Sequence, residues 1–176
     1  MNVKYPINSS EVFTSEELDK IISVGEKVGL FSAKVEIKGK EVVAPKKRDT
    51  QISWIQPTKE NLWIFSKASK TLSTEPISTL QAFQYSVYYV GGHYGWHRDI
   101  GKEGQVISNR IIAGTLQLSD PGDYQGGILK IKSPDKIITE VEKERGRVTV
   151  FPAGWQHTVT PVTKGVRKTL VMWGLK

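Results

Sequence analysis

The second half of the chain is a long series of short strand-like runs separated by turn-forming residues. Clusters such as Ser119–Asp123, Ser133–Asp135 and Pro152–Gly154 interrupt it with residues that favour the backbone angles of tight turns. About eight strands in succession after a helical start predict the two facing sheets of a jelly roll. We therefore expect an all-β core with flanking helices, a double-stranded β-helix of the cupin-like kind. The expected strands are 80–90, 95–99, 110–118, 127–132, 137–141, 147–151, 156–161 and 166–174.

Helical patterns are confined to the first part of the chain. Thr14–Glu17 fits a capping box, and apolar residues then recur at helical spacing, which predicts a helix ending near Gly25 or Gly29. Lys59–Leu72 carries apolar residues on one side and predicts a second helix packed on a sheet. The remaining expected strands are a hairpin of 33–37 and 41–43 around Lys38–Lys40, and a strand over 51–55.

The length of 176 residues, 38% of them hydrophobic, is enough for one core and too short for two comfortable ones. We therefore expect a single domain over 1–176. In this interpretation residues 1–78 supply N-terminal helices, packed on one sheet, and supporting strands. Residues 79–176 form the jelly-roll core that carries the site.

Cysteine is absent, which excludes a disulfide framework and a thiolate metal site. The start of the chain, Met1–Asn8, lacks the apolar segment of a signal peptide, and no apolar run approaches membrane-spanning length. We expect a cytoplasmic, reducing setting, in the host cell if the chain is phage-encoded, and no membrane partner. The oligomeric state is left open by the sequence.

The net charge of +7 raises the question of a nucleic-acid partner, since basic surfaces attract phosphates. The densest basic stretch, Lys34–Arg48, is mixed with Glu36 and Glu41, so a solvated turn region accounts for it without a partner. The same stretch beside a catalytic site would also steer an acidic substrate. Both interpretations remain open, and the first is favoured.

Two histidines and an aspartate suggest a metal site. His97 and Asp99 stand two apart in an expected strand, so their side chains point to the same face. His157 follows on a distant strand-like segment and would complete a set of two imidazoles and one carboxylate. Such a set leaves coordination positions open, as in non-haem Fe(II) oxygenases. Without cysteine, the donors suit Fe(II), Mn(II) or Zn(II).

An arginine on the last strand-like run is the second candidate for chemistry. Arg167 precedes the apolar segment Thr169–Trp173. A guanidinium held among apolar neighbours needs an anionic partner, because an unpaired buried charge is costly. A dicarboxylate cosubstrate would provide one, bound through a planar, bidentate contact.

These residues are part of a longer pattern. It comprises Tyr88-x-x-Gly91-x-x-Tyr94-x-x-His97-x-Asp99, then Leu116–Pro121, Tyr124-x-Gly126-Gly127-x-Leu129, Phe151-Pro152, His157-x-Val-x-Pro161-Val162 and Gly165-x-Arg167-x-x-Leu170-Val-x-Trp173. With this pattern the chain resembles the 2-oxoglutarate/Fe(II)-dependent dioxygenases of the prolyl 4-hydroxylase-like, PKHD-type group, close to small phage and bacterial members. The resemblance is dense over residues 80–176 and looser upstream.

The resemblance implies roles for individual residues. His97, Asp99 and His157 would be the iron ligands, and Arg167 would bind the distal carboxylate of 2-oxoglutarate. Tyr88 would place its hydroxyl against the same cosubstrate, or would be plain aromatic packing, and Gln117 is a weaker candidate for that carboxylate. Three tryptophans are expected to fill the barrel rather than touch substrate: Trp96, Trp155 and Trp173.

The implied activity is hydroxylation of an unactivated C–H bond with Fe(II), 2-oxoglutarate and O₂, releasing succinate and CO₂, with ascorbate as an optional reductant. The ligand Asp99 argues for hydroxylation, since related halogenases lack this carboxylate. By resemblance the expected substrate is peptidyl proline, with a free amino acid or another small molecule as the alternative. An AlkB-type demethylase would have a second arginine where Trp173 stands, so a nucleic-acid substrate is disfavoured.

A different class of function stays open, a non-catalytic module that binds metal or 2-oxoglutarate. The presence of all three ligands and Arg167 argues against it. A cupin with another metal is also less favoured, because its site would be richer in histidine than a chain with three.

Overall fold

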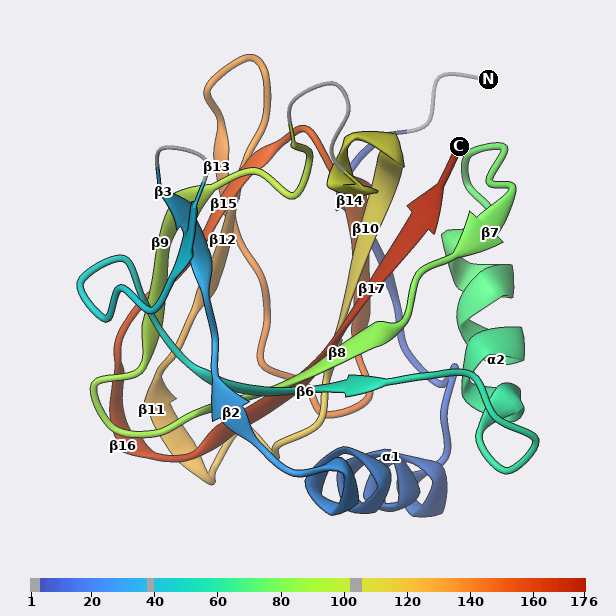
Figure 1. The fold of residues 1–176 in the computed structure, drawn as a ribbon, viewed down its shortest axis with the longest axis horizontal. Helices are drawn as coiled ribbons and strands as arrows, with labels where there is room; N and C mark the ends of the chain where they lie inside the picture. The colour runs from blue at the N-terminus through green and yellow to red at the C-terminus, as the bar shows by residue number, and fades with distance from the viewer. Residues whose placement is uncertain (1–3, 38–39, 102–105) are drawn as a thin grey trace.

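The computed structural model describes residues 4–37, 40–101 and 106–176, in which two antiparallel sheets face each other (Figure 1). The larger sheet has eight strands in the order β1-β14-β10-β17-β8-β6-β2, with β7 paired to β17. The smaller sheet has five, in the order β13-β12-β15-β9-β5. Strands distant along the chain thus become neighbours, as a jelly roll requires.

The larger sheet contains strands from both parts of the chain. Its members are β1 (Ile7–Ser9), β2 (Phe31–Ser32), β6 (Gln51–Ile55), β7 (Thr79–Leu80), β8 (Phe83–Tyr88), β10 (Arg110–Gln117), β14 (Val148–Pro152) and β17 (Arg167–Leu175). The smaller sheet is built from β5 (Arg48–Asp49), β9 (His93–His97), β12 (Leu129–Lys132), β13 (Ile138–Glu140) and β15 (Gln156–Val159).

Helix α1 (Ser15–Val28) begins at the predicted capping box. The Thr14 hydroxyl accepts a hydrogen bond from the Glu17 amide at 3.3 Å, and the Glu17 carboxylate accepts one from the Thr14 amide at 2.8 Å. The helix ends at Gly29, whose φ of 91° is accessible at low cost only to glycine. Its buried side, which includes Leu18 and Ile21, faces the larger sheet. Both the start of the helix and the later of its two predicted ends are confirmed.

Helix α2 (Leu62–Leu72) covers another part of the same sheet face (Figure 1). Its buried residues Ile64, Phe65, Ala68 and Leu72 join the main hydrophobic cluster, where the Phe65 and Phe83 rings stack at 4.1 Å. The helix begins three residues later than predicted. Among the described residues, no helix has the length and apolar character needed to cross a membrane.

Side chains alternate across the larger sheet, and β17 shows this most clearly. Leu170 and Met172 belong to the cluster under the helices, whereas Thr169, Val171 and Trp173 line a cavity between the two sheets. This alternation follows from the two-residue period of a strand. One face of the sheet therefore builds the core, and the other faces the cavity.

The predicted fold class, a double-stranded β-helix with helices on one sheet, is confirmed. The expected hairpin is present as β3 (Val35–Ile37) and β4 (Lys40–Val42), with residues 38–39 of its turn outside the described part. Some features were not predicted. They are β1, β2, β5, a 3₁₀ turn at Val106–Asn109 and a two-stranded sheet of β11 (Tyr124–Gly126) and β16 (Val162–Gly165).

Candidate metal and cosubstrate site

His97, Asp99 and His157 meet in the cavity between the sheets. Strands β9 and β15 pair so that His97 lies directly opposite His157. The Nε2 atoms of His97 and His157 lie 3.6 and 3.5 Å from the two carboxylate oxygens of Asp99. One ligand atom from each residue lies within 4.8 Å of the others. The three side chains can therefore hold a single metal ion.

Backbone carbonyls orient both imidazoles. His97 Nδ1 lies 2.8 Å from the carbonyl oxygen of Gly95, and His157 Nδ1 lies 3.1 Å from that of Trp155. Because a carbonyl oxygen can only accept, each Nδ1 carries the proton, and the Nε2 lone pair is directed toward Asp99. This is the arrangement by which hydrogen-bond partners fix metal-binding histidines.

Asp99 does not lie in a strand, contrary to the prediction of a strand over 95–99. Strand β9 ends at His97, and Asp99 sits in a bend where its amide donates to the carbonyl of Ala153 at 3.0 Å. The indole N–H of Trp173 donates to Asp99 Oδ2 at 2.9 Å. These two bonds, rather than strand alternation, hold the carboxylate beside the imidazoles.

The cluster is poised to bind a cation near neutral pH. Burial lowers the pKa of His97 to about 3, with the neighbouring His157 as a second cause, so the ring is neutral and its lone pair is free. Burial alone would raise the pKa of Asp99, but His157, His97, the Trp173 N–H and Arg110 together outweigh burial and lower it. Asp99 is therefore a carboxylate. A neutral imidazole and an ionised carboxylate are the forms that bind metal.

Arg167 reaches the same cavity from β17. Its side chain is 1% exposed, and its Nε and Nη2 atoms have no hydrogen-bond partner within residues 4–37, 40–101 and 106–176. The Tyr124 hydroxyl and Thr169 Oγ1 are also buried without partners. A buried guanidinium without an anion is strongly destabilising, so this group of donors is suited to an anionic ligand.

Gly127 makes this placement of Arg167 feasible. A β-carbon at this position would lie 2.9 Å from Arg167 Cδ and 3.2 Å from Cε2 of Tyr124, and the φ of 56° already disfavours other residues. Arg167 and Tyr124 therefore both pack against this glycine.

The structure places the weaker candidates in different positions. Tyr88 is 3% exposed, lines the cavity and lies opposite Arg167 in the sheet, with its ring centroid 5.1 Å from the guanidinium carbon. This position is compatible with both of its predicted roles. Gln117 is buried on the cavity-facing side of β10, next but one to Thr115, but is not among the residues that line the cavity.

Of the three tryptophans expected to fill the barrel, Trp173 lines the cavity and is 3% exposed, and Trp155 packs at the edge of the inner cluster. The prediction was wrong for Trp96, which is 46% exposed. Trp96 has the opposite strand parity to its neighbour His97, which points into the cavity, so its side chain lies on the outer side of β9. A register shift between Tyr94 and His97 interrupts the regular alternation along this strand.

Sequence reasoning missed four polar residues near the site. Thr169 could have been found from its strand parity with Arg167, and Tyr124 from its place in a recognised motif. Arg48 and Arg110 line the cavity, as Thr169 does, and the Arg110 guanidinium carbon lies 3.8 Å from the Trp173 ring centroid. Arg48 comes from a two-residue strand that carries no periodic signal, so its place was not predictable.

A jelly roll that gathers two imidazoles, one carboxylate and a buried, unpaired guanidinium in one cavity has the donor set of a non-haem iron oxygenase. The family model of the 2OG-Fe(II) oxygenase superfamily matches residues 83–174. The chain therefore belongs to the 2OG-Fe(II) oxygenase superfamily. The metal of this superfamily is Fe(II) and its cosubstrate is 2-oxoglutarate, and the donors of the cavity fit both.

Among curated proteins, the chain is similar to PKHD-type hydroxylases. It is 33% identical over 142 residues to one from Paraburkholderia xenovorans, a match that covers 74% of this chain and 60% of the relative. The chain spans about half the length of the curated relatives it matches, 42% for one from Gloeothece citriformis.

Solved structures resemble the whole fold. A prolyl-4-hydroxylase from Pseudomonas putida superposes with a TM-score of 0.74 at 18% identity, covering 97% of this chain and 91% of the other. A prolyl hydroxylase from Trichoplax adhaerens, solved with a peptide fragment of a hypoxia-inducible factor, gives 0.77 at 17% identity and covers 96% and 82%. At such identities these neighbours establish the fold.

Proposed function

We propose that this domain is a Fe(II)- and 2-oxoglutarate-dependent dioxygenase that hydroxylates an unactivated C–H bond and releases succinate and CO₂. The observation that carries the proposal is that one cavity contains both the His97, Asp99 and His157 cluster and the unpaired Arg167. A metal site alone would suit many proteins. The combination with a buried cation is what a dicarboxylate cosubstrate requires.

In this proposal His97, Asp99 and His157 hold the iron. The Gly95 and Trp155 carbonyls keep both imidazoles in the tautomer with a free Nε2, and the Trp173 indole holds the carboxylate in place. Tyr94 stacks on the His97 ring with 3.4 Å between centroids, which further limits its rotation. These contacts fix the ligand atoms before the metal binds.

Arg167 binds the distal carboxylate of 2-oxoglutarate, assisted by the hydroxyls of Tyr124 and Thr169. Each of these groups is a buried donor without a partner, so an anion there would pair atoms that are otherwise unsatisfied. Tyr88 and Gln117 are further proposed contacts to the cosubstrate. When iron and 2-oxoglutarate are bound, the site supplies an oxidant that replaces a C–H hydrogen by a hydroxyl group, with ascorbate as an optional reductant and O₂ as cosubstrate.

The proposed substrate is peptidyl proline. Two observations support this choice: the fold resembles prolyl hydroxylases, one of which was solved with a peptide fragment, and the cavity wall beside the metal cluster is aromatic, with Tyr94 and Trp173. The alternative is a free amino acid or another small molecule. Trp173, where an AlkB-type enzyme would have arginine, argues against nucleic acid.

Residues 1–176 are proposed to act as one oxygenase domain. The 1–78 segment supplies the helices and supporting strands, and 79–176 supplies the catalytic jelly roll. The pairing of β6 with β8 and of β1 with β14 supports this unity, because the N-terminal strands complete the larger sheet. A cytoplasmic location is part of the proposal, supported by the absence of cysteine.

The cofactor assignment is tested by anaerobic titration with Fe(II) and 2-oxoglutarate. Chelation of the keto acid to ferrous iron should give a weak visible charge-transfer band that is absent in His157→Ala and retained in Lys59→Gln, an exposed site far from the cavity. Absence of the band in folded, metal-loaded protein would favour a non-catalytic module.

The substrate is tested with proline-containing peptides and free amino acids, with succinate and the hydroxylated product measured together. A product found only with peptides supports the proposal. Succinate formation coupled only to free amino acids would replace peptidyl proline by the small-molecule alternative.

A further inference from the structure

A second buried arginine faces the cavity from the smaller sheet. Arg48 lies on β5, directly opposite Tyr94 on β9, and its side chain lines the cavity that contains the metal cluster. It is 8% exposed, and its guanidinium carbon lies 4.4 Å from the Tyr94 ring centroid. Arg48 and Arg167 thus approach the cavity from opposite sheets.

Among the residues that the structure describes, the guanidinium of Arg48 has no polar partner. Within the described residues, its side chain makes no hydrogen bond and no ion pair, and its Nε is buried without an acceptor. The contact with Tyr94 satisfies one face of the group, which leaves the N–H groups at its edge. An arginine buried this deeply is normally paired.

The buried charges of the described part of the chain do not balance. Apart from tyrosines, the ionisable residues with little exposure are Arg48, Arg110, Arg167, His157 and Asp99. Asp99, their sole carboxylate, belongs to the metal cluster. Arg110 donates to Gln81 at 2.8 Å and to the Asp99 carbonyl at 3.2 Å. After 2-oxoglutarate is assigned to Arg167, Arg48 is left without a neutralising group.

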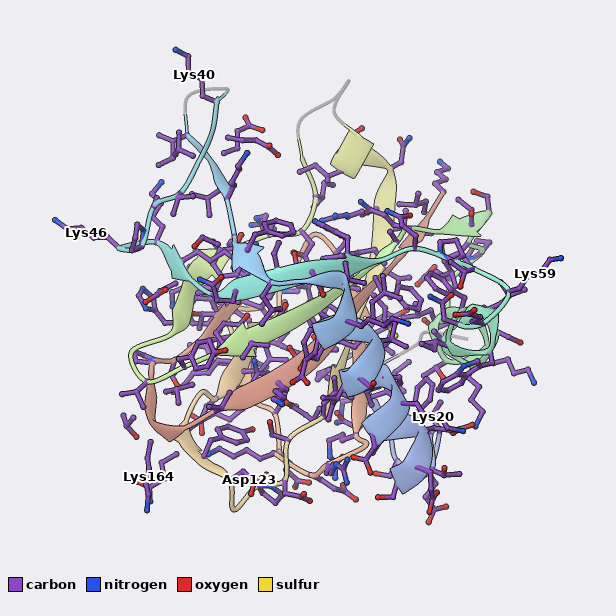
Figure 2. All side chains as sticks on the ribbon, turned by 60° about the horizontal axis from the view of Figure 1, so that its bottom comes forward. Lys20, Lys40, Lys46, Lys59, Asp123 and Lys164 are labelled. Atoms are coloured by element: carbon purple, nitrogen blue, oxygen red, sulfur yellow. The ribbon has the colours of Figure 1, made fainter. Side chains whose placement is uncertain are left out.

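Neighbouring charges make the position of Arg48 less favourable still. The pKa values of both Arg110 and His97 are lowered, mainly by burial, and the positive charge of Arg48 lowers both further. Arg48 is therefore close enough to these groups for like charges to repel. Two acidic residues, Glu36 and Glu41, line the cavity, but both are exposed at its mouth on the β3–β4 hairpin. By contrast, Lys46, Lys59 and Lys164 project outward into solvent (Figure 2), where an unpaired charge is tolerated.

We infer that Arg48 binds a carboxylate of the primary substrate, and that the enzyme selects substrates with an acidic group close to the carbon that is hydroxylated. This inference rests on the proposed function. In a proline-containing substrate such a carboxylate has two sources: the side chain of an acidic residue adjacent to proline, or the terminal carboxylate of proline itself. In both cases a charge-assisted hydrogen bond would form with an arginine that is 8% exposed, where such a bond is stronger than in water.

The test measures binding rather than turnover. Protein loaded anaerobically with Fe(II) and 2-oxoglutarate is titrated with matched probes: a Pro-Glu and a Pro-Gln peptide, and peptides that end in proline or in prolinamide. We expect the acidic probe of one pair to bind about ten- to a hundredfold more tightly than its neutral partner. The pair that shows the difference identifies the source of the carboxylate.

Three variants locate the effect. In Arg48→Gln the preference for the acidic probe should vanish, and in Arg48→Lys it should be partly retained. In Lys59→Gln, which removes a distant exposed charge, it should be unchanged. The affinity for 2-oxoglutarate should be the same in all three, which also shows that each variant is folded.

The inference would be overturned by equal binding of acidic and neutral probes, or by a preference that survives in Arg48→Gln. A loss of 2-oxoglutarate affinity in Arg48→Gln would instead assign the residue to the cosubstrate. If no proline probe binds, the proline assignment fails, and free amino acids and their amides are compared in the same way. If the free acids then bind more tightly than their amides, and this preference depends on Arg48, the carboxylate site is retained. If there is no such preference, Arg48 does not bind a substrate carboxylate.

Discussion

The two faces of the larger sheet differ in how completely their buried groups are paired. The face under the helices is apolar, and its polar groups find partners, as where the Ser53 hydroxyl donates to the Gly25 carbonyl at 2.7 Å. On the face toward the cavity, Arg167 and Thr169 have buried atoms without partners. Strand β17 supplies residues to both faces.

This difference separates two tasks within one sheet. The core face stabilises the fold through close packing. The cavity face holds groups that lower the stability of the free protein and gain partners when ligands bind. Substitutions on the core face should therefore lower stability and leave ligand affinity unchanged. Substitutions on the cavity face should lower ligand affinity and leave stability unchanged.

The largest expected effect is loss of the metal cluster. Asp99→Gly should abolish hydroxylation and succinate formation, because two imidazoles alone would hold the metal weakly and without charge compensation. Product and succinate are quantified with saturating Fe(II) and 2-oxoglutarate. Undiminished turnover in this variant would refute the role of Asp99.

Arg167→Met should weaken 2-oxoglutarate binding at least about a hundredfold, since paired charge-assisted hydrogen bonds are lost. The stability of the ligand-free protein should be unchanged or higher, because an unpaired buried charge is replaced by an apolar chain of similar length. Cosubstrate titration and thermal melting measure the two effects. Arg147→Met is the matched control: it removes surface ion pairs to Glu142 and Glu144 and should leave 2-oxoglutarate affinity intact.

On the core face, Leu170→Ala should reduce the free energy of unfolding by about 2–5 kcal/mol, because it opens a cavity beneath the helices. Affinity for 2-oxoglutarate in the folded fraction should remain. The adjacent Thr169→Val should show the reverse, with stability kept and affinity reduced. Urea unfolding and cosubstrate titration compare the pair. Similar effects of both substitutions would contradict the separation of the two faces.

In the metal-free protein, acidification should lower the free energy of unfolding, because His97 is harder to protonate in the folded state than in the unfolded chain. The pKa of His97 is lowered from 6.5 to about 3 in the folded state, so between these values the unfolded chain binds a proton that the folded one does not. Stability should therefore fall as pH drops through this window, by up to about 1.4 kcal/mol for each pH unit. Urea unfolding from pH 7 to 4 measures the slope, and it should be shallower in His97→Gln. An equal slope in both proteins would mean that His97 is not the group responsible.

The smallest effect is expected at the start of α1. Thr14→Ala removes one half of the capping box and should lower the free energy of unfolding by about 1 kcal/mol, with no change in ligand affinity. Thermal melting detects the loss. Ser10→Ala, which removes an exposed hydroxyl contact with Glu144, serves as a control and should have a smaller effect.

Much of this architecture was predictable because it depends on local patterns. Strand periodicity and turn clusters predicted the succession of strands along the chain and the jelly-roll class, and Thr14–Glu17 predicted the start of α1. Motif resemblance identified His97, Asp99, His157 and Arg167 as a candidate set, and the structure brings all four to one cavity.

The rest depends on contacts between distant segments, which a single sequence does not encode locally. The bend that carries Asp99 is held by Ala153 and Trp173, far along the chain. Strand β5 has only two residues, too few to show strand periodicity, and it is defined by its pairing with β9. The position of Arg48 therefore could not be predicted from the local sequence. The exposure of Trp96 likewise follows from where β9 lies at the cavity wall, not from its aromatic character.

Strand β17 has a further consequence, for the order in which the protein is assembled. It comes last among the strands along the chain, yet it lies between β10 and β8 in the larger sheet. During synthesis β8 and β10 therefore emerge before the strand that pairs with both of them. The backbone N–H and C=O groups on their facing edges remain unpaired until β17 has been made. The same segment brings Arg167 and Trp173. The sheet and the oxidising site must then be completed by one event, the insertion of a single strand.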